Sequence, residues 1–174
     1  MHPNPERSVS IRRLQRPPIR QSVLVQSDIS HTFSTFVRTI ALWWPVALFS
    51  SGKEEVRDIL VEERLGGRIS EVWEDGTVVV WGEILRWDPP HRFLMTWSGT
   101  PATTEVELTF LALGPALTRV TVEHRGWETL SQAQWDQVCP RPGGYAAGWE
   151  RILGAFVAAT EKRPIGTSLP SGNY

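Results

Sequence analysis

Residues 104–127 alternate apolar and polar side chains with a period of two, in two consecutive runs. Such alternation predicts a β-hairpin with one face covered by protein and the other in water. The covered face carries Val106, Leu108, Phe110, Val120, Val122 and His124. A titratable side chain that points into an apolar interior is a candidate functional group, so His124 is singled out.

Residues 56–98 carry further strand patterns. The runs are 56–64, 68–73, 77–87 and 92–98, and the breaks between them are Gly66-Gly67, Asp75-Gly76 and Asp88-Pro89-Pro90. An Asp-Gly pair favours a tight hairpin turn, and proline cannot donate to a sheet ladder. Together with a first strand at 19–26, these runs predict a curved antiparallel sheet of about seven strands.

The run 77–87 is apolar on both faces. One alternating set is Val78, Val80 and Ile84, and the other is Val79, Trp81, Leu85 and Trp87. The pattern leaves open which set lines the interior. The outer set could be covered by the N-terminal arm or by a second subunit in a homodimer, since exposed apolar groups often mark an interface.

Helical spacing appears on both sides of the strands. Ser27 or Asp28 caps a helix that runs to about residue 40, and a second short helical turn at 42–44 stops at Pro45. A long final helix is predicted from about 145 to 162. Its apolar stripe is Tyr145, Trp149, Ile152, Leu153 and Phe156. Packing this helix on the sheet gives an α+β fold, with a cavity expected between the two.

Length and charge narrow the class of protein. The 174 residues predict one domain at 18–163, a flexible arm at 1–17 with a short strand near 10–14, and a disordered tail at 164–174. A net charge of −1 gives no bulk attraction to nucleic acid or to an anionic membrane. The chain shows no secretory segment and no long apolar run, and Cys139 is its single cysteine. We therefore expect a cytoplasmic protein.

Nine tryptophans are many for this length. They either fill the core or line a pocket for an apolar or aromatic ligand, in which a few polar groups fix the ligand's orientation. The candidate ligand-binding residues are Trp44, Glu71, Trp73, Met95, Trp97, His124, Tyr145 and Trp149.

His124 has two interpretations. It either contacts a ligand or acts as an acid or base, or it is a structural residue bonded to Tyr145 or to a backbone carbonyl. Glu71 and Glu83 alternate with apolar neighbours and could share the covered face, although rim positions are favoured for Glu71 and His124. No metal-ligand spacing and no nucleotide-binding motif is present, so no metal and no cofactor are expected.

Several short motifs are found in a characteristic order. They are Trp43-Trp44-Pro45, Gly66-Gly67-Arg68-Ile69, Trp81-Gly82-Glu83-Ile84, Trp87-Asp88-Pro89-Pro90, Thr96-Trp97, Thr104-Glu105-Val106, Glu123-His124-Arg125-Gly126-Trp127 and Tyr145 with Gly148-Trp149. Over residues 19–160 the chain resembles the START-type helix-grip superfamily, in the branch named after the activator of the heat-shock chaperone ATPase. That resemblance implies a sheet wrapped around a long C-terminal helix. Members of the superfamily include ligand carriers, polyketide cyclases and aromatases, stress-response receptors and co-chaperones.

Three functions follow as hypotheses. The first is a binding protein that holds an apolar or aromatic small molecule between sheet and helix. The second is an enzyme of the cyclase, aromatase or hydrolase kind, with His124 as acid and base. The third is a co-chaperone-like interaction module that uses the outer sheet face or the tryptophans at 43 and 44. Binding is favoured, because His124 has no convincing second acid or base beside it.

Overall fold

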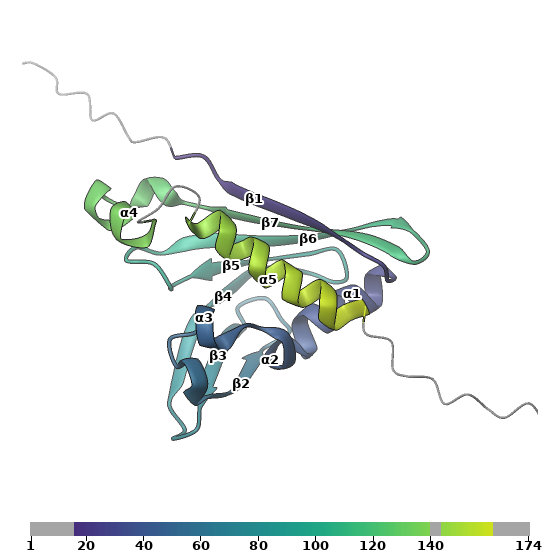
Figure 1. Cartoon of the computed structure of the whole chain (residues 1–174), viewed down its shortest axis with the longest axis horizontal. Helices are drawn as coiled ribbons and strands as arrows, with labels where there is room; N and C mark the ends of the chain where they lie inside the picture. Colours follow the sequence, from purple (N-terminus) through teal and green to yellow (C-terminus); the bar gives the residue numbers. More distant parts are fainter. Residues whose placement is uncertain (1–15, 140–143, 162–174) are drawn as a thin grey trace, which may run out of the picture.

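The computed structural model describes residues 16–139 and 144–161 (Figure 1). Seven antiparallel strands form one curved sheet in the order β1-β7-β6-β5-β4-β3-β2. The strands are β1 Ile19–Val25, β2 Val56–Val61, β3 Arg68–Trp73, β4 Val78–Asp88, β5 Arg92–Trp97, β6 Thr104–Gly114 and β7 Leu117–Arg125. The predicted α+β helix-grip architecture is confirmed.

The described residues also form five α-helices, and the last of them, α5, lies across the concave side of the sheet (Figure 1). They are α1 Ile29–Arg38, α2 Ile40–Trp43, α3 Val46–Phe49, α4 Gln132–Val138 and α5 Gly144–Glu161, with 3-10 turns η1 Lys53–Glu55 and η2 Trp127–Thr129. Asp28 caps α1, and its carboxylate accepts from the His31 N–H at 2.9 Å.

Two helices were not predicted. Pro45 ends α2 as expected, but the chain then turns again to form α3. Ser131 and Gln134 form a reciprocal capping box that begins α4. The Ser-x-x-Gln spacing was visible in the sequence and is a recognised helix start, so the missed helix had a local signal.

The predicted apolar stripe of α5 faces the sheet. Trp149, Ile152, Leu153 and Phe156 are buried, and Tyr145 is half-buried. Phe36 of α1 packs edge-on against Phe156 with ring centroids 5.0 Å apart. Among the core side chains, a void of only about 20 Å³ remains beside Phe36, Phe93 and Trp149. Close-packed side chains therefore fill most of the space between sheet and helix.

Two bulges explain the ambiguous strand 77–87. The pairing of β4 shifts once against β3, beside Gly82, and once against β5, beside Leu85. Each bulge adds a residue and moves the following side chains to the other face. The inward set is therefore Val79, Trp81, Ile84 and Trp87, whereas Val78, Val80, Glu83 and Leu85 are exposed. Neither alternating set predicted for this strand is correct over its whole length, and Glu83 does not share the covered face.

Gly82 lies at the first of these bulges. A Cβ atom built on it would lie 1.7 Å from the backbone oxygen of Thr96 on β5. Only glycine permits this close approach of two backbones, so the bulge that turns Trp81 inward depends on Gly82.

The described chain begins at Arg16, which lies against the η2–α4 segment. Its guanidinium donates to the backbone oxygens of Trp127 at 2.8 Å and Leu130 at 2.6 Å, and it stacks over the Trp135 ring. The arm before it, with the strand predicted near 10–14, and the predicted tail at 164–174 lie outside the described residues. No helix in the described residues is long and apolar enough to cross a membrane.

Candidate functional site: an aromatic cavity beside the C-terminal helix

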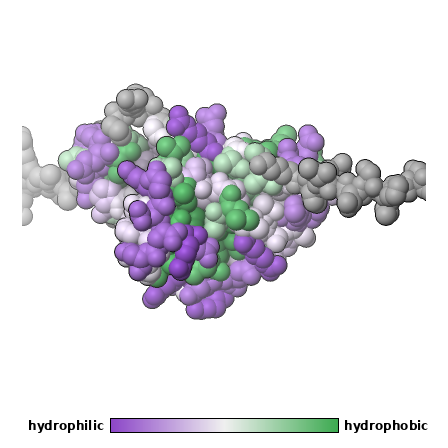
Figure 2. Space-filling view, turned by 60° about the horizontal axis from the view of Figure 1, so that its bottom comes forward, coloured by the Kyte–Doolittle hydropathy of each residue, from purple (hydrophilic) through white to green (hydrophobic). Residues whose placement is uncertain are grey.

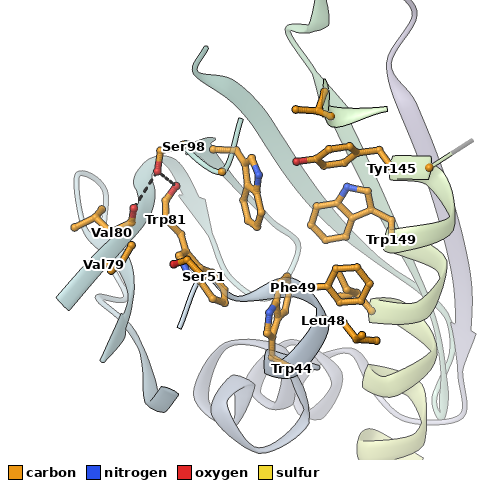
Figure 3. A pocket seen from close by; sticks show the side chains of 16 residues that line it. Trp44, Leu48, Phe49, Ser51, Val79, Val80, Trp81, Ser98, Tyr145 and Trp149 are labelled. Carbon is orange, nitrogen blue, oxygen red and sulfur yellow. Dashed lines mark hydrogen bonds between the residues drawn. The ribbon is translucent and has the colours of Figure 1, made fainter. Parts of the chain in front are cut away.

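A cavity of about 770 Å³ opens between the N-terminal half of α5, the α2–α3 segment and the adjoining ends of β4 and β5 (Figure 3). Its walls are formed by Trp44, Leu48, Phe49, Ser51, Val79, Val80, Trp81, Trp97, Ser98, Gly99, Val138, Gly144, Tyr145, Gly148, Trp149 and Ile152. None of these residues carries a formal charge at neutral pH. The volume lies within the range of roughly 300–1,000 Å³ typical of small-molecule sites.

A buried carboxylate fixes one wall of the cavity. Glu71 of β3 accepts hydrogen bonds at Oε1 from Ser51 Oγ at 2.6 Å, the Gly52 N–H at 2.9 Å and the Trp73 indole at 2.8 Å. Its Oε2 accepts from the Trp81 indole at 3.0 Å. Indole and backbone N–H groups can only donate, so this arrangement matches an ionised carboxylate. Glu71 thereby holds Trp81 and the Ser51–Gly52 turn in place.

The Glu71 side chain is fully buried. Ser51, which covers it on the cavity side, is itself exposed to solvent. Burial by itself opposes ionisation of the carboxyl. The hydrogen bonds from Ser51, Trp73, Trp81 and Gly52 outweigh that effect and lower the pKa of Glu71 below its ordinary value of 4.5.

A buried histidine fixes the opposite wall. The Trp149 indole donates to His124 Nδ1 at 3.1 Å, and His124 Nε2 lies 2.8 Å from Thr104 Oγ1. Because indole only donates, Nδ1 must be unprotonated, and the proton of the neutral ring lies on Nε2 and is donated to Thr104. His124 is fully buried and packs against Trp127, with ring centroids 4.1 Å apart.

Burial lowers the pKa of His124 from 6.5 to about 3, because the charged imidazolium would lose its water. The only contacts to its ring nitrogens in the described residues are Trp149 and Thr104, and neither is an anion that could offset this loss. His124 is therefore neutral at physiological pH and acts as a support for Trp149.

Two other indoles of the wall are held by packing alone. The N–H groups of Trp44 and Trp97 are buried and have no acceptor within the described residues. Trp44 lies 4.8 Å from the Trp81 ring and 6.3 Å from the Trp149 ring. Tyr145 directs its hydroxyl into the cavity (Figure 3). Burial raises the pKa of this phenol, so the hydroxyl stays protonated at neutral pH.

Residues 32–161 match the model of the family "Activator of Hsp90 ATPase homolog 1-like protein". The chain belongs to this family. The resemblance described above is thereby confirmed for the branch as well as for the fold. A search among curated proteins found no match.

Solved structures include relatives of this AHSA1-like chain. The anthrahydroquino-γ-pyrone synthase Txn09 is 29% identical with a TM-score of 0.53, and the match covers 83% of this chain and 97% of that one. CalC, a self-sacrificing resistance protein from Micromonospora echinospora, is 27% identical with a TM-score of 0.59, covering 83% and 94%. An AHSA1-like protein from Aeromonas hydrophila shares the fold at 21% identity, with a TM-score of 0.53 and coverage of 84% and 99%.

The structure brings together half of the predicted ligand-binding residues of this AHSA1-like chain. Trp44, Trp97, Tyr145 and Trp149 line the cavity. Glu71 and His124 lie behind the wall, and the rim positions favoured for them are wrong because both are fully buried. Trp73 contacts Glu71 outside the cavity, and Met95 lines only the small void in the core.

Several lining residues were not predicted from the sequence. Trp81 was assigned to an ambiguous strand, and the two serines, Ser51 and Ser98, carried no recognisable motif. The signal for Trp81 was the Trp-Gly pair, because a glycine inside a strand often marks a bulge. No comparable signal marked the serines, since their role depends on contacts with distant strands.

Trp43 and Trp44 of this AHSA1-like chain cannot form an interaction surface, because only 6% and 5% of their surfaces are exposed. The exposed side chain in that segment is Leu42, at 85%. Figure 2 shows apolar areas among hydrophilic side chains on the face that comes forward in that view.

Proposed function

We propose that this protein binds a flat, apolar or aromatic small molecule in the cavity beside α5. The observation that carries the proposal is the composition of the walls: four indoles and a phenol surround the space, and no described lining residue is charged. Flat aromatic ligands stack on such rings, and burial of apolar surface supplies most of the binding free energy. Glu71 and His124 support this function by fixing Trp81 and Trp149 before a ligand arrives.

One relative supports this class of ligand, and a second is named for a different role. Txn09 is named as a synthase of an anthrahydroquino-γ-pyrone, a polycyclic aromatic compound. CalC is named as a resistance protein, which is a role other than synthesis. Since these relatives differ in their named roles, the cavity is better evidence than the family for what this chain does.

A templating cyclase is the second candidate, favoured by the named activity of Txn09. Among the described lining residues, Tyr145 is the most acidic side chain, but burial raises its pKa, so the phenol stays protonated at neutral pH and offers no general base. His124 lies behind Trp149 with both ring nitrogens bonded, so the acid–base role considered for it has little geometric support. Binding is therefore the function that the geometry supports best.

Filling the cavity from α5 tests the proposal. Gly148 lines the cavity, and a Cβ atom on it would lie 3.3 Å from Phe49 Cε1. We expect Gly148→Leu to weaken binding of anthraquinone-2-sulfonate about tenfold or more, because the new side chain occupies space needed by the rings. Titration of tryptophan fluorescence with this probe measures the affinity. Its sulfonate can remain in water at the open mouth.

Gly154→Leu is the matched control on the same helix. A Cβ atom on Gly154 meets nothing within 4 Å, and the residue is exposed. Both substitutions remove a glycine from a helix and raise helix propensity by about 0.8 kcal/mol, so they differ mainly in the direction of the new side chain. Equal affinities of the two variants for the probe would refute the proposed site.

A further inference from the structure

Two serines bring oxygen atoms to the otherwise apolar β4–β5 side of the cavity. Ser51 follows α3, and Ser98 follows β5 (Figure 3). Both are tied to Trp81: Ser98 Oγ donates to the Trp81 backbone oxygen at 2.7 Å, and Ser51 shares the Glu71 carboxylate with the Trp81 indole. A ring stacked on Trp81 would therefore have a serine oxygen near its edge.

The hydroxyl proton of Ser51 is donated to Glu71. Its Oγ lies 2.6 Å from Glu71 Oε1, and an ionised carboxylate only accepts. The Glu71 oxygen is itself fixed by the Gly52 N–H and the Trp73 indole, so it cannot turn away. Ser51 consequently presents lone pairs, and no proton, to the cavity.

The Ser98 hydroxyl also donates its proton, but to backbone carbonyl oxygens, which are weaker acceptors than a carboxylate. Its hydroxyl is shared between the backbone oxygens of Val80 at 2.9 Å and Trp81 at 2.7 Å. A hydroxyl that donates to a carboxylate is the more strongly polarised of the two, and its lone pairs are the better acceptors. Ser51 is therefore the stronger acceptor on this wall.

We propose that the ligand is a hydroxylated aromatic molecule whose O–H group donates to Ser51 Oγ, with Glu71 as the positioning residue that keeps this oxygen an acceptor. This inference rests on the proposed function and adds the polar group that the ligand must carry. The Tyr145 hydroxyl also reaches the cavity, from α5, so it can serve a second ligand oxygen (Figure 3).

A matched pair of probes tests the inference. 2-Naphthol and 2-methoxynaphthalene have the same rings and the same oxygen position, but only the first can donate. We expect the protein to bind 2-naphthol about fivefold more tightly by isothermal titration calorimetry, the ratio of one neutral hydrogen bond. Ser51→Ala should bring the ratio of the two affinities close to one, and Ser51→Thr, which keeps the hydroxyl, should restore it.

Ser98→Ala separates the two serines. We expect it to leave most of the preference for 2-naphthol intact. Loss of the preference in Ser98→Ala and its survival in Ser51→Ala would overturn the assignment to Ser51. Equal binding of the two probes by the unmodified protein would overturn the hydroxyl requirement and leave the proposed function standing. Failure of both probes to bind would count against the proposed function itself.

Discussion

Replacing His124 with asparagine is expected to flatten the dependence of folding stability on pH between pH 7 and pH 5. In the intact protein the folded-state pKa of His124 lies near 3, whereas the unfolded chain titrates near 6.5. Below pH 6.5 the unfolded state therefore binds a proton that the folded state does not, and stability falls as the pH falls. The expected loss for the intact protein is about 2 kcal/mol between pH 7 and pH 5.

The asparagine variant cannot take up that proton, so this part of the pH dependence should disappear. At pH 7 the variant should also be less stable by about 2–4 kcal/mol, because a smaller side chain leaves a gap among the rings and can reach only one of the two partners of His124. Urea unfolding followed by tryptophan fluorescence at both pH values measures these differences.

His31→Asn is the control for this experiment. His31 is exposed on α1, and the helix-capping bond from its backbone N–H does not depend on the imidazole. This variant should keep the pH dependence of the intact protein. Two results would show that the ring is not the neutral support described above. One is a dependence of stability on pH in His124→Asn that equals that of the intact protein, and the other is an NMR titration of His124 near pH 6.5 in the folded protein.

Replacing Glu71 with glutamine is expected to destabilise the fold by about 2–4 kcal/mol at pH 7, as measured by the same urea unfolding. An amide has one acceptor oxygen, whereas the Glu71 carboxylate accepts from four donors with two oxygens. In the variant the amide NH₂ would face either the Trp81 indole or the donors at Oε1. The amide N–H and the N–H or O–H group facing it would then both be donors in a buried site, and neither would have an acceptor.

The sign of the acid response follows from the lowered pKa of Glu71. Its contribution to stability is present above the unfolded pKa, near 4.5, and is lost as the pH falls through the lower folded value. Glu71→Gln should therefore be less sensitive to acid below pH 4.5 than the intact protein. Glu83→Gln, on the exposed face of β4, should match the intact protein in stability. A Glu71 variant as stable as this control would mean that the four hydrogen bonds contribute little.

Most strands and the helix stripe were predictable because they depend on local patterns. Alternation in β6 and β7 and the spacing of Trp149, Leu153 and Phe156 report directly which side is buried. Pro45 and the Asp75-Gly76 turn marked element ends for equally local reasons.

The cavity wall was predictable only in part. The two bulges in β4 change which side chains face inward, and a bulge depends on backbone contacts such as that of Gly82 with Thr96. Glu71 and His124 were identified as polar groups on a covered face, but their roles depend on partners that are not their sequence neighbours. His124 meets Trp149 across 25 positions, and Glu71 meets Ser51 across 20. Contacts between residues so far apart in the sequence leave no local pattern, so the rim positions were favoured wrongly.

The most direct test of the central claim is a ¹H–¹⁵N NMR spectrum of the tryptophan indole N–H groups, recorded with and without saturating anthraquinone-2-sulfonate. Four indoles line the cavity, those of Trp44, Trp81, Trp97 and Trp149, whereas Trp127 and Trp135 lie elsewhere. We predict that the probe shifts the signals of the first four and leaves Trp127, which is bonded to the His124 backbone oxygen, in place. Unmoved signals from the four cavity indoles, or shifts confined to Trp127 and Trp135, would contradict a ligand site beside α5.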